Sequence, residues 1–92
     1  MITMKKIFLF SSKLCPDCSR MKEFLSKNNI SYIDMDITEN LFFLKKFLKF
    51  RDKNPAFDEI KEKGDIGIPC VVINEGEKIF FNPDTLDINE LK

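Results

Sequence analysis

The stretch Cys15-Pro16-Asp17-Cys18 constrains the fold of this chain more than any other feature of the sequence. An apolar run at residues 7–10 directly precedes it and predicts a short buried strand. Apolar side chains then recur at helical spacing from residue 18 to residue 25. Proline suits the first turn of a helix, where its missing N–H costs nothing. The two cysteines therefore lie where a strand ends and a helix begins.

A Cys-x-x-Cys pair at the start of a helix favours redox chemistry. The helix N-terminus carries partial positive charge and unpaired N–H groups, so it stabilises a thiolate and lowers its pKa. We expect Cys15 to be exposed and to attack a disulfide sulfur. Cys18 should point inward and resolve the mixed disulfide. Lys13 would favour the thiolate by its charge, and Asp17 would oppose it.

Two other interpretations of the pair are weaker. A structural zinc ion usually takes four Cys or His ligands, and this chain has no His and only one further cysteine, Cys70. No metal is therefore expected. A chance pair of packed cysteines fits poorly with a strand–CPDC–helix context. For Cys70 we expect a small buried residue that opens a strand, with a third thiol near the CPDC pair or a metal ligand as the alternatives.

The rest of the chain alternates between strand and helix patterns. The predicted elements after the first helix are a strand at 31–37, a helix at 39–53, a second helix at 54–64, strands at 68–73 and 78–81, and a short helix at 83–92. Asn54-Pro55 separates the two middle helices, and Gly64 ends the second. A strand–helix–strand unit implies parallel strands, and the closing hairpin adds antiparallel ones. The prediction is one α/β domain over residues 1–92, with a mixed four-stranded sheet flanked by helices.

The first middle helix is rich in phenylalanine and lysine. Its apolar stripe is expected through Leu41, Leu44, Phe47 and Leu48, facing the core. Phe42 and Phe50 would then be the candidates for an exposed dimer or docking surface. In the lengthened segment that follows, basic residues either contact a carboxylate near the active site or form a solvated helix face. These basic residues are Arg51, Lys53 and Lys61.

Two segments, SSKLCPDCSRMKEFL and GIPCVVINEGEKIFF, resemble glutaredoxin and, more broadly, the thioredoxin fold. More narrowly, the chain resembles a bacterial glutaredoxin-related group with a lengthened, proline-interrupted middle helix. The resemblance implies that Pro69 has a cis peptide bond and lies against the active-site cysteines. It also implies that the backbone of Ile68 pairs with a bound peptide or glutathione. The implied substrate- or glutathione-binding set is Lys13, Pro16, Asp17, Ile68, Pro69, Asp84 and Thr85.

The chain departs from the glutaredoxin pattern in the glutathione-binding region. Glutaredoxins carry Gly-Gly and an acidic pair after the last strand, where this chain reads FFNPDTLD. Asp84 would replace part of the acidic pair, and Thr85 would add a hydroxyl. Asp17 stands where glutaredoxins have an aromatic residue. Its negative charge should weaken binding of glutathione, which is itself an anion.

The predicted function is that of a small dithiol–disulfide oxidoreductase that reduces protein disulfides or mixed disulfides. It holds no bound cofactor, and its electrons come from glutathione or from a flavoenzyme of the thioredoxin-reductase type. The alternatives are a non-catalytic redox sensor or adaptor, and an iron–sulfur-binding module on the same fold. Fifteen basic and fifteen acidic residues cancel, which argues against a nucleic-acid partner. No apolar run suits a signal peptide or a membrane span, so the expected location is the cytoplasm.

Overall fold

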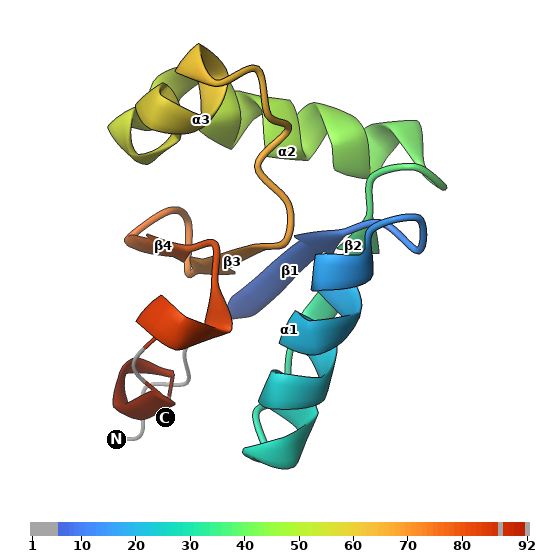
Figure 1. The fold of residues 1–92 in the computed structure, drawn as a ribbon, viewed down its shortest axis with the longest axis vertical. Helices are drawn as coiled ribbons and strands as arrows, with labels where there is room; N and C mark the ends of the chain where they lie inside the picture. The colour runs from blue at the N-terminus through green and yellow to red at the C-terminus, as the bar shows by residue number, and fades with distance from the viewer. Residues whose placement is uncertain (1–5, 87, 92) are drawn as a thin grey trace.

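A four-stranded mixed sheet forms the centre of the protein in the computed structural model, which describes residues 6–86 and 88–91 (Figure 1). Its strands lie in the order β2-β1-β3-β4. The strands are β1 (Ile7–Ser11), β2 (Ile33–Asp36), β3 (Cys70–Ile73) and β4 (Lys78–Phe80). β1 runs parallel to β2 and antiparallel to β3, and β3 and β4 form the hairpin. The predicted mixed sheet is confirmed.

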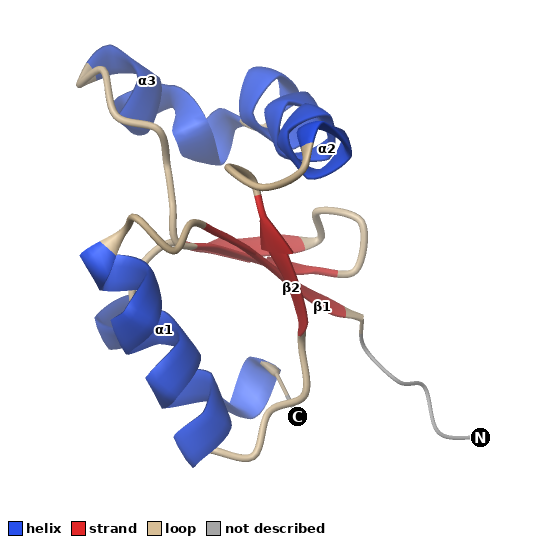
Figure 2. Ribbon diagram, turned by 90° about the vertical axis from the view of Figure 1, so that its right-hand side faces the viewer, coloured by secondary structure: helices blue, strands red, loops and turns tan. Residues whose placement is uncertain are grey.

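Helices cover both faces of this sheet. α1 (Pro16–Lys27) lies on one face, and α2 (Leu41–Lys53) and α3 (Asp58–Glu62) lie on the other (Figure 2). Successive residues of a strand point to opposite faces, and β1 is buried along its whole length. Ile7 and Leu9 of β1 therefore join a mainly aliphatic cluster with α1, which includes Met21 and Leu25. Phe8 and Phe10 join a mainly aromatic cluster with the α2 side.

α1 begins and ends as the sequence predicts. Cys15 is its N-cap in an extended conformation, and Pro16 is its first residue. Its last turn closes at Asn28, whose backbone N–H donates to the Phe24 carbonyl, and Asn29 follows with a φ of 59°. Asparagine tolerates this left-handed conformation better than most residues, so it ends a helix well.

The predicted core face of α2 is partly wrong. Leu41 is 72% exposed and Leu48 is 37% exposed. The helix instead buries Phe47 fully and packs Phe43, Leu44 and Phe50 partly against the aromatic cluster. The reason is a chain of ring contacts, because Phe47 lies 5.3 Å from Phe10 and 5.8 Å from Phe57 between ring centroids. Two apolar stripes overlap on this helix, and the one with the phenylalanine rings packs against the aromatic cluster.

The segment after α2 follows the prediction, and the C-terminus does not. Asn54 accepts a hydrogen bond from the Ala56 N–H at the start of a 3-10 turn, η1 (Pro55–Phe57), which leads into α3. Gly64 ends this segment with a φ of 77°. The single helix expected at 83–92 is wrong: the described residues form two 3-10 turns, η2 (Pro83–Thr85) and η3 (Ile88–Glu90). Leu86 adopts an extended conformation between them and is buried in the α1-side cluster.

Candidate redox site

The strand-to-helix loop holds Cys15 at the N-terminus of α1. Its backbone N–H donates to the Ser12 carbonyl at 3.0 Å, and its own carbonyl accepts the Cys18 N–H at 3.2 Å. The Ser12 hydroxyl also accepts the Leu14 N–H at 3.1 Å. These three bonds fix the backbone on both sides of Cys15. Its side chain is partly exposed, so a substrate sulfur can approach it.

Cys18 is in a different environment, one turn into the same helix. It is 1% exposed, and its thiol is hydrogen-bonded to Cys15. Burial, and after it the bond with Cys15, raises the pKa of Cys18 to about 12. The charge of Lys22 and a bond with the Ser12 backbone oppose it only in part. Cys18 therefore keeps its proton at neutral pH, as expected of a thiol that donates to its neighbour rather than attacking a substrate.

A groove of about 580 Å³ opens beside Cys15, and we call it the Cys15 groove. Its walls come from three parts of the chain that are distant in sequence: the start of α1, the segment from α3 to β3, and the residue after β4. The lining residues are Cys15, Asp17, Ile60, Gly64, Asp65, Ile66, Gly67, Ile68 and Phe81. They combine apolar side chains with two carboxylates and include no lysine or arginine.

The peptide bond between Ile68 and Pro69 is cis, which confirms a specific prediction from the sequence. Pro69 is buried at the start of β3, and Ile68 is half-buried and lines the Cys15 groove. Of the predicted substrate-binding residues, Asp17 and Ile68 thus lie in one groove with Cys15. Pro16 is exposed at the first position of α1.

Arg51 supports the wall of the Cys15 groove from α2, a role that the sequence pattern did not predict. Its guanidinium group donates to the backbone carbonyls of Ile66 at 2.9 Å and Asp65 at 2.7 Å. It therefore attaches the groove wall to α2, and the partners it has among the described residues are these backbone carbonyls rather than a carboxylate. Lys53 lies elsewhere on α2, and Lys61 is exposed on α3. The sequence feature that could have indicated this role is an arginine in a helix whose other basic residues are lysines. The planar guanidinium group of arginine can donate to two adjacent acceptors.

Lys13 is engaged away from the thiols. Its ammonium group lies 2.5 Å from a carboxylate oxygen of Glu39, and this bond raises the pKa of Lys13. Its backbone N–H donates to Asp36 at 3.1 Å. Lys13 thus joins the loop after β1 to the loop after β2. Its charge is expected to support the Cys15 thiolate, but the contacts described here are with Glu39 and Asp36 instead.

Asp84 is not brought to the Cys15 groove. It lies in η2, where one of its carboxylate oxygens is 4.0 Å from the Arg20 guanidinium group on α1. Together they line a separate depression of about 260 Å³. The side chain of Thr85 lies outside the described part of the chain. The expected glutathione-binding set is therefore divided between two places.

Cys70 is fully buried on the side of the sheet away from α1. It belongs to the aromatic cluster with Phe10 and Val72, and burial raises its pKa. This position supports a small buried residue rather than a third thiol beside the CPDC pair. Among the described residues no group of three His, Cys, Asp or Glu side chains is arranged to hold a metal ion. Within the same residues, no helix is long and apolar enough to cross a membrane.

Comparison with known proteins agrees with this architecture. Residues 7–77 match the model of the glutaredoxin family. A protein of Haemophilus influenzae described as uncharacterized is 32% identical over 89 residues, which cover 97% of this chain and 96% of that protein. The crystal structure of a mutant thioredoxin-like protein is 26% identical, with a TM-score of 0.55 and coverage of 96% of this chain and 91% of that one.

A second solved structure supports the fold alone. It is actin interacting protein 5, which is 17% identical and has a TM-score of 0.56, with coverage of 98% of this chain and 84% of that one. The protein thus has the thioredoxin/glutaredoxin fold, with α1 on one face of the mixed sheet and α2 and α3 on the other. Family and fold together support a redox-related function. The chain belongs to the glutaredoxin family.

Proposed function

We propose that this protein is a dithiol–disulfide oxidoreductase that reduces disulfides of proteins through Cys15 and Cys18. The observation that carries the proposal is the asymmetry of the two thiols. Cys15 is accessible at the edge of a groove, while Cys18 is buried, protonated and hydrogen-bonded to it. An attacking thiol must reach its substrate, and a resolving thiol needs only to reach its partner.

The reaction proceeds in two exchanges. The Cys15 thiolate attacks one sulfur of the substrate disulfide, a Cys15–substrate disulfide forms, and the other substrate sulfur leaves and takes up a proton. Cys18 then loses its proton and attacks the sulfur of Cys15. The Cys15–Cys18 disulfide forms, and the second substrate thiolate leaves and is protonated. The substrate has gained two electrons and two protons. The protein has lost two electrons and the proton of Cys18, and the second proton is the one that Cys15 released to solvent when its thiolate formed.

The first exchange also prepares the second. Part of the raised pKa of Cys18 comes from its interaction with Cys15. Once Cys15 is in a mixed disulfide it carries no negative charge, so this part of the shift disappears and Cys18 loses its proton more readily. Cys18 should thus remain a thiol until a substrate is attached.

Charges around the Cys15 groove favour a protein substrate over glutathione. Asp17 and Asp65 line the groove, and none of the described residues that line it is a cation able to receive the carboxylates of glutathione. Asp84 lies outside the groove beside Arg20. The apolar residues Ile66 and Phe81 offer instead a surface for side chains that flank a protein disulfide. We therefore propose a flavoenzyme of the thioredoxin-reductase type as the electron source, in the cytoplasm, where thiols are kept reduced.

The test is steady-state disulfide reduction with two electron sources in parallel. One assay supplies glutathione with glutathione reductase, and the other supplies NADPH with thioredoxin reductase; insulin and a glutathione mixed disulfide serve as substrates. We expect reduction of insulin with thioredoxin reductase and little turnover with glutathione. Efficient turnover with glutathione alone would refute the proposed electron source. Absence of turnover with both would refute the catalytic function in favour of a redox sensor or adaptor.

Two variants test the assigned roles. Cys15→Ser should abolish all thiol–disulfide exchange. Cys18→Ser should stop the reduction of protein disulfides and accumulate a covalent adduct on Cys15, which intact-protein mass spectrometry can detect. Cys70→Ser is the matched control and should leave exchange unchanged if the protein folds. Undiminished insulin reduction by Cys18→Ser would show that the assignment of the resolving thiol is wrong.

A further inference from the structure

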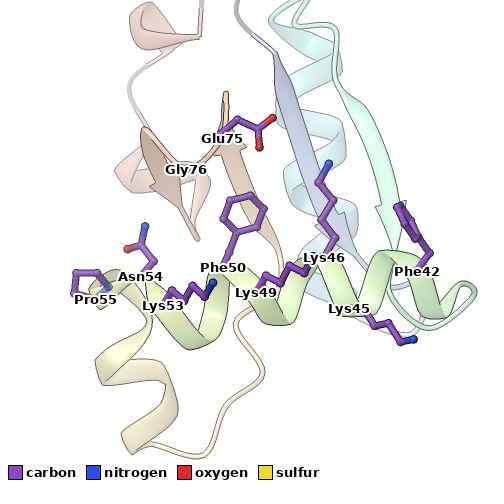
Figure 3. Close-up of a pocket in the computed structure, with 10 residues that line it drawn as sticks. All are labelled: Phe42, Lys45, Lys46, Lys49, Phe50, Lys53, Asn54, Pro55, Glu75 and Gly76. Carbon is purple, nitrogen blue, oxygen red and sulfur yellow. The ribbon is translucent and has the colours of Figure 1, made fainter.

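A depression lies along α2, away from the lining of the Cys15 groove. It has a volume of about 680 Å³ and runs between α2 and the turn that joins β3 to β4. We call it the α2 trough. Figure 3 shows Phe42, Lys46 and Phe50 pointing from α2 toward the sheet, while Glu75 and Gly76 face them from the turn. The residues that α2 contributes are Phe42, Lys45, Lys46, Lys49, Phe50 and Lys53.

The α2 trough is strongly basic, although the chain as a whole has no net charge. Four lysines line it, and Glu75 is the one carboxylate among its lining residues. No carboxylate within the described residues forms an ion pair with any of these four lysines. The ammonium group of Lys46 lies 4.6 Å from the centre of the Phe8 ring, which directs it into the trough.

Lys49 is at the centre of this positive charge. It follows Lys45 by four positions and Lys46 by three, and it precedes Lys53 by four. Residues three and four positions apart are neighbours on a helix surface, and like charges at this spacing destabilise the helix. An anionic group bound among these lysines would remove that repulsion. The arrangement therefore lowers helix stability in the free protein and favours an anionic partner.

Two aromatic rings lie next to the lysines in the trough. Phe42 is 70% exposed and is supported on one side by the Phe43 ring, 6.4 Å away between centroids. Phe50 is held in place: its ring lies 5.9 Å from that of Phe10, and a Cβ added at Gly76 would come within 3.2 Å of it. The trough thus has one fixed ring and one accessible ring, with the four lysines along the helix between and beside them.

We propose that the α2 trough is a docking site for an acidic segment of a partner protein that carries an aromatic or large aliphatic side chain. The carboxylates of the segment would pair with the lysines, and its apolar side chain would pack on Phe42 and Phe50. A nucleic acid fits less well, because no arginine lines the trough and the protein has no overall basic excess. The volume is that of a pocket for a few side chains.

The proposed docking site and the Cys15 groove share no lining residue. α1, whose N-cap is Cys15, lies on the opposite face of the sheet from α2 (Figure 2). A partner held on the α2 trough would therefore leave Cys15 accessible. The docking proposal does not depend on the proposed catalytic function, and each can fail without the other.

The test uses a short synthetic peptide in which glutamates flank a single phenylalanine. We would titrate it into the isotopically labelled, full-length protein and follow backbone amide signals by NMR. Signals of α2 and of the turn at Gly76 should shift, and those of the Cys15 groove should not. Lys49→Gln should weaken binding about three- to tenfold, and Phe42→Ser should do so by a similar factor. Affinity should fall as salt concentration rises.

Matched controls make the result decisive. Lys61→Gln removes an exposed lysine of α3 outside the trough and should change affinity less than about twofold. A peptide with glutamine in place of glutamate should not bind. The proposal is overturned if the acidic peptide shows no binding at about 1 mM, or if its shifts map elsewhere. It is also overturned if oligothymidylate or anionic phospholipid vesicles occupy the same lysines more tightly than the peptide.

Discussion

Arg51 attaches the wall of the Cys15 groove to α2, so replacing it should loosen that wall by a measurable amount. The guanidinium group donates to two adjacent carbonyls, at 2.7 and 2.9 Å. A hydrogen bond from a charged donor contributes about 1.5–3 kcal/mol. The Arg51 side chain is only half-buried, so water can replace part of each bond, and we take about 1–2 kcal/mol for both together.

Arg51→Gln removes the charge and the fork of donors but keeps most of the aliphatic chain. Local opening of the groove wall should then become roughly 5- to 30-fold more frequent, which corresponds to about 1–2 kcal/mol. The assay is native-state hydrogen exchange at the Asp65 amide, which donates to the Ile60 carbonyl at 2.9 Å. Exchange at amides of β1 should change less, since those amides lie in the centre of the sheet.

Lys53→Gln is the control for this measurement, because it removes a neighbouring positive charge on α2 that does not line the Cys15 groove. It should leave exchange at Asp65 unchanged. In the disulfide assay, Arg51→Gln should mainly raise KM for protein substrates, because Cys15 and Cys18 keep their geometry. The reasoning is refuted if Arg51→Gln and Lys53→Gln give the same exchange rate at Asp65, or if only kcat changes.

Three further predictions follow from the pKa, backbone and charge of single residues. Because the pKa of Cys18 is raised and its thiolate is scarce at neutral pH, resolution of the mixed disulfide should accelerate roughly tenfold per pH unit above pH 7 until that thiol ionises. A flat stopped-flow profile would contradict this. Gly67→Ala places a Cβ 3.0 Å from a ring carbon at a φ of 102°, so the free energy of unfolding should fall by about 1–3 kcal/mol. Gly64→Ala has open space and should cost less in the same urea titration. Asp17→Asn removes a negative charge from the groove, so it should raise turnover of a glutathione mixed disulfide about two- to fivefold at low salt. Asp58→Asn lies outside the groove and should not change this turnover. Equal rates for both variants would count against the electrostatic argument.

Local signals in the sequence were enough to predict where the two cysteines of the CPDC stretch lie in the fold. The position of Cys15 and Cys18 depends on one strand end, one proline and one helix start, all within a few residues. The resemblance to glutaredoxins added the cis bond before Pro69, and the structure confirms it. Short apolar runs likewise predicted β1 and β3, because a strand in the centre of a sheet that is covered on both faces is buried along its whole length.

Features that depend on distant packing were not predictable in the same way. Two apolar stripes on α2 compete, and only the rings of Phe10 and Phe57 decide that Phe47 rather than Leu48 is buried. Arg51 binds backbone carbonyls, which every residue has, so no particular residue type in the sequence identifies its partners. The position of Asp84 depends on the path of the chain after β4. The sequence pattern there predicts one helix, whereas the described residues form two short 3-10 turns.

The unequal burial of the three cysteines has a practical consequence for handling the protein. Cys18 and Cys70 are both about as buried as any side chain in the core, and Cys15 alone has access to solvent. A mild alkylating reagent added to the reduced native protein should therefore modify a single sulfur, whereas the unfolded chain should take up three equivalents. Counting reactive thiols by mass thus reports how much of a preparation is folded, without any knowledge of its substrate.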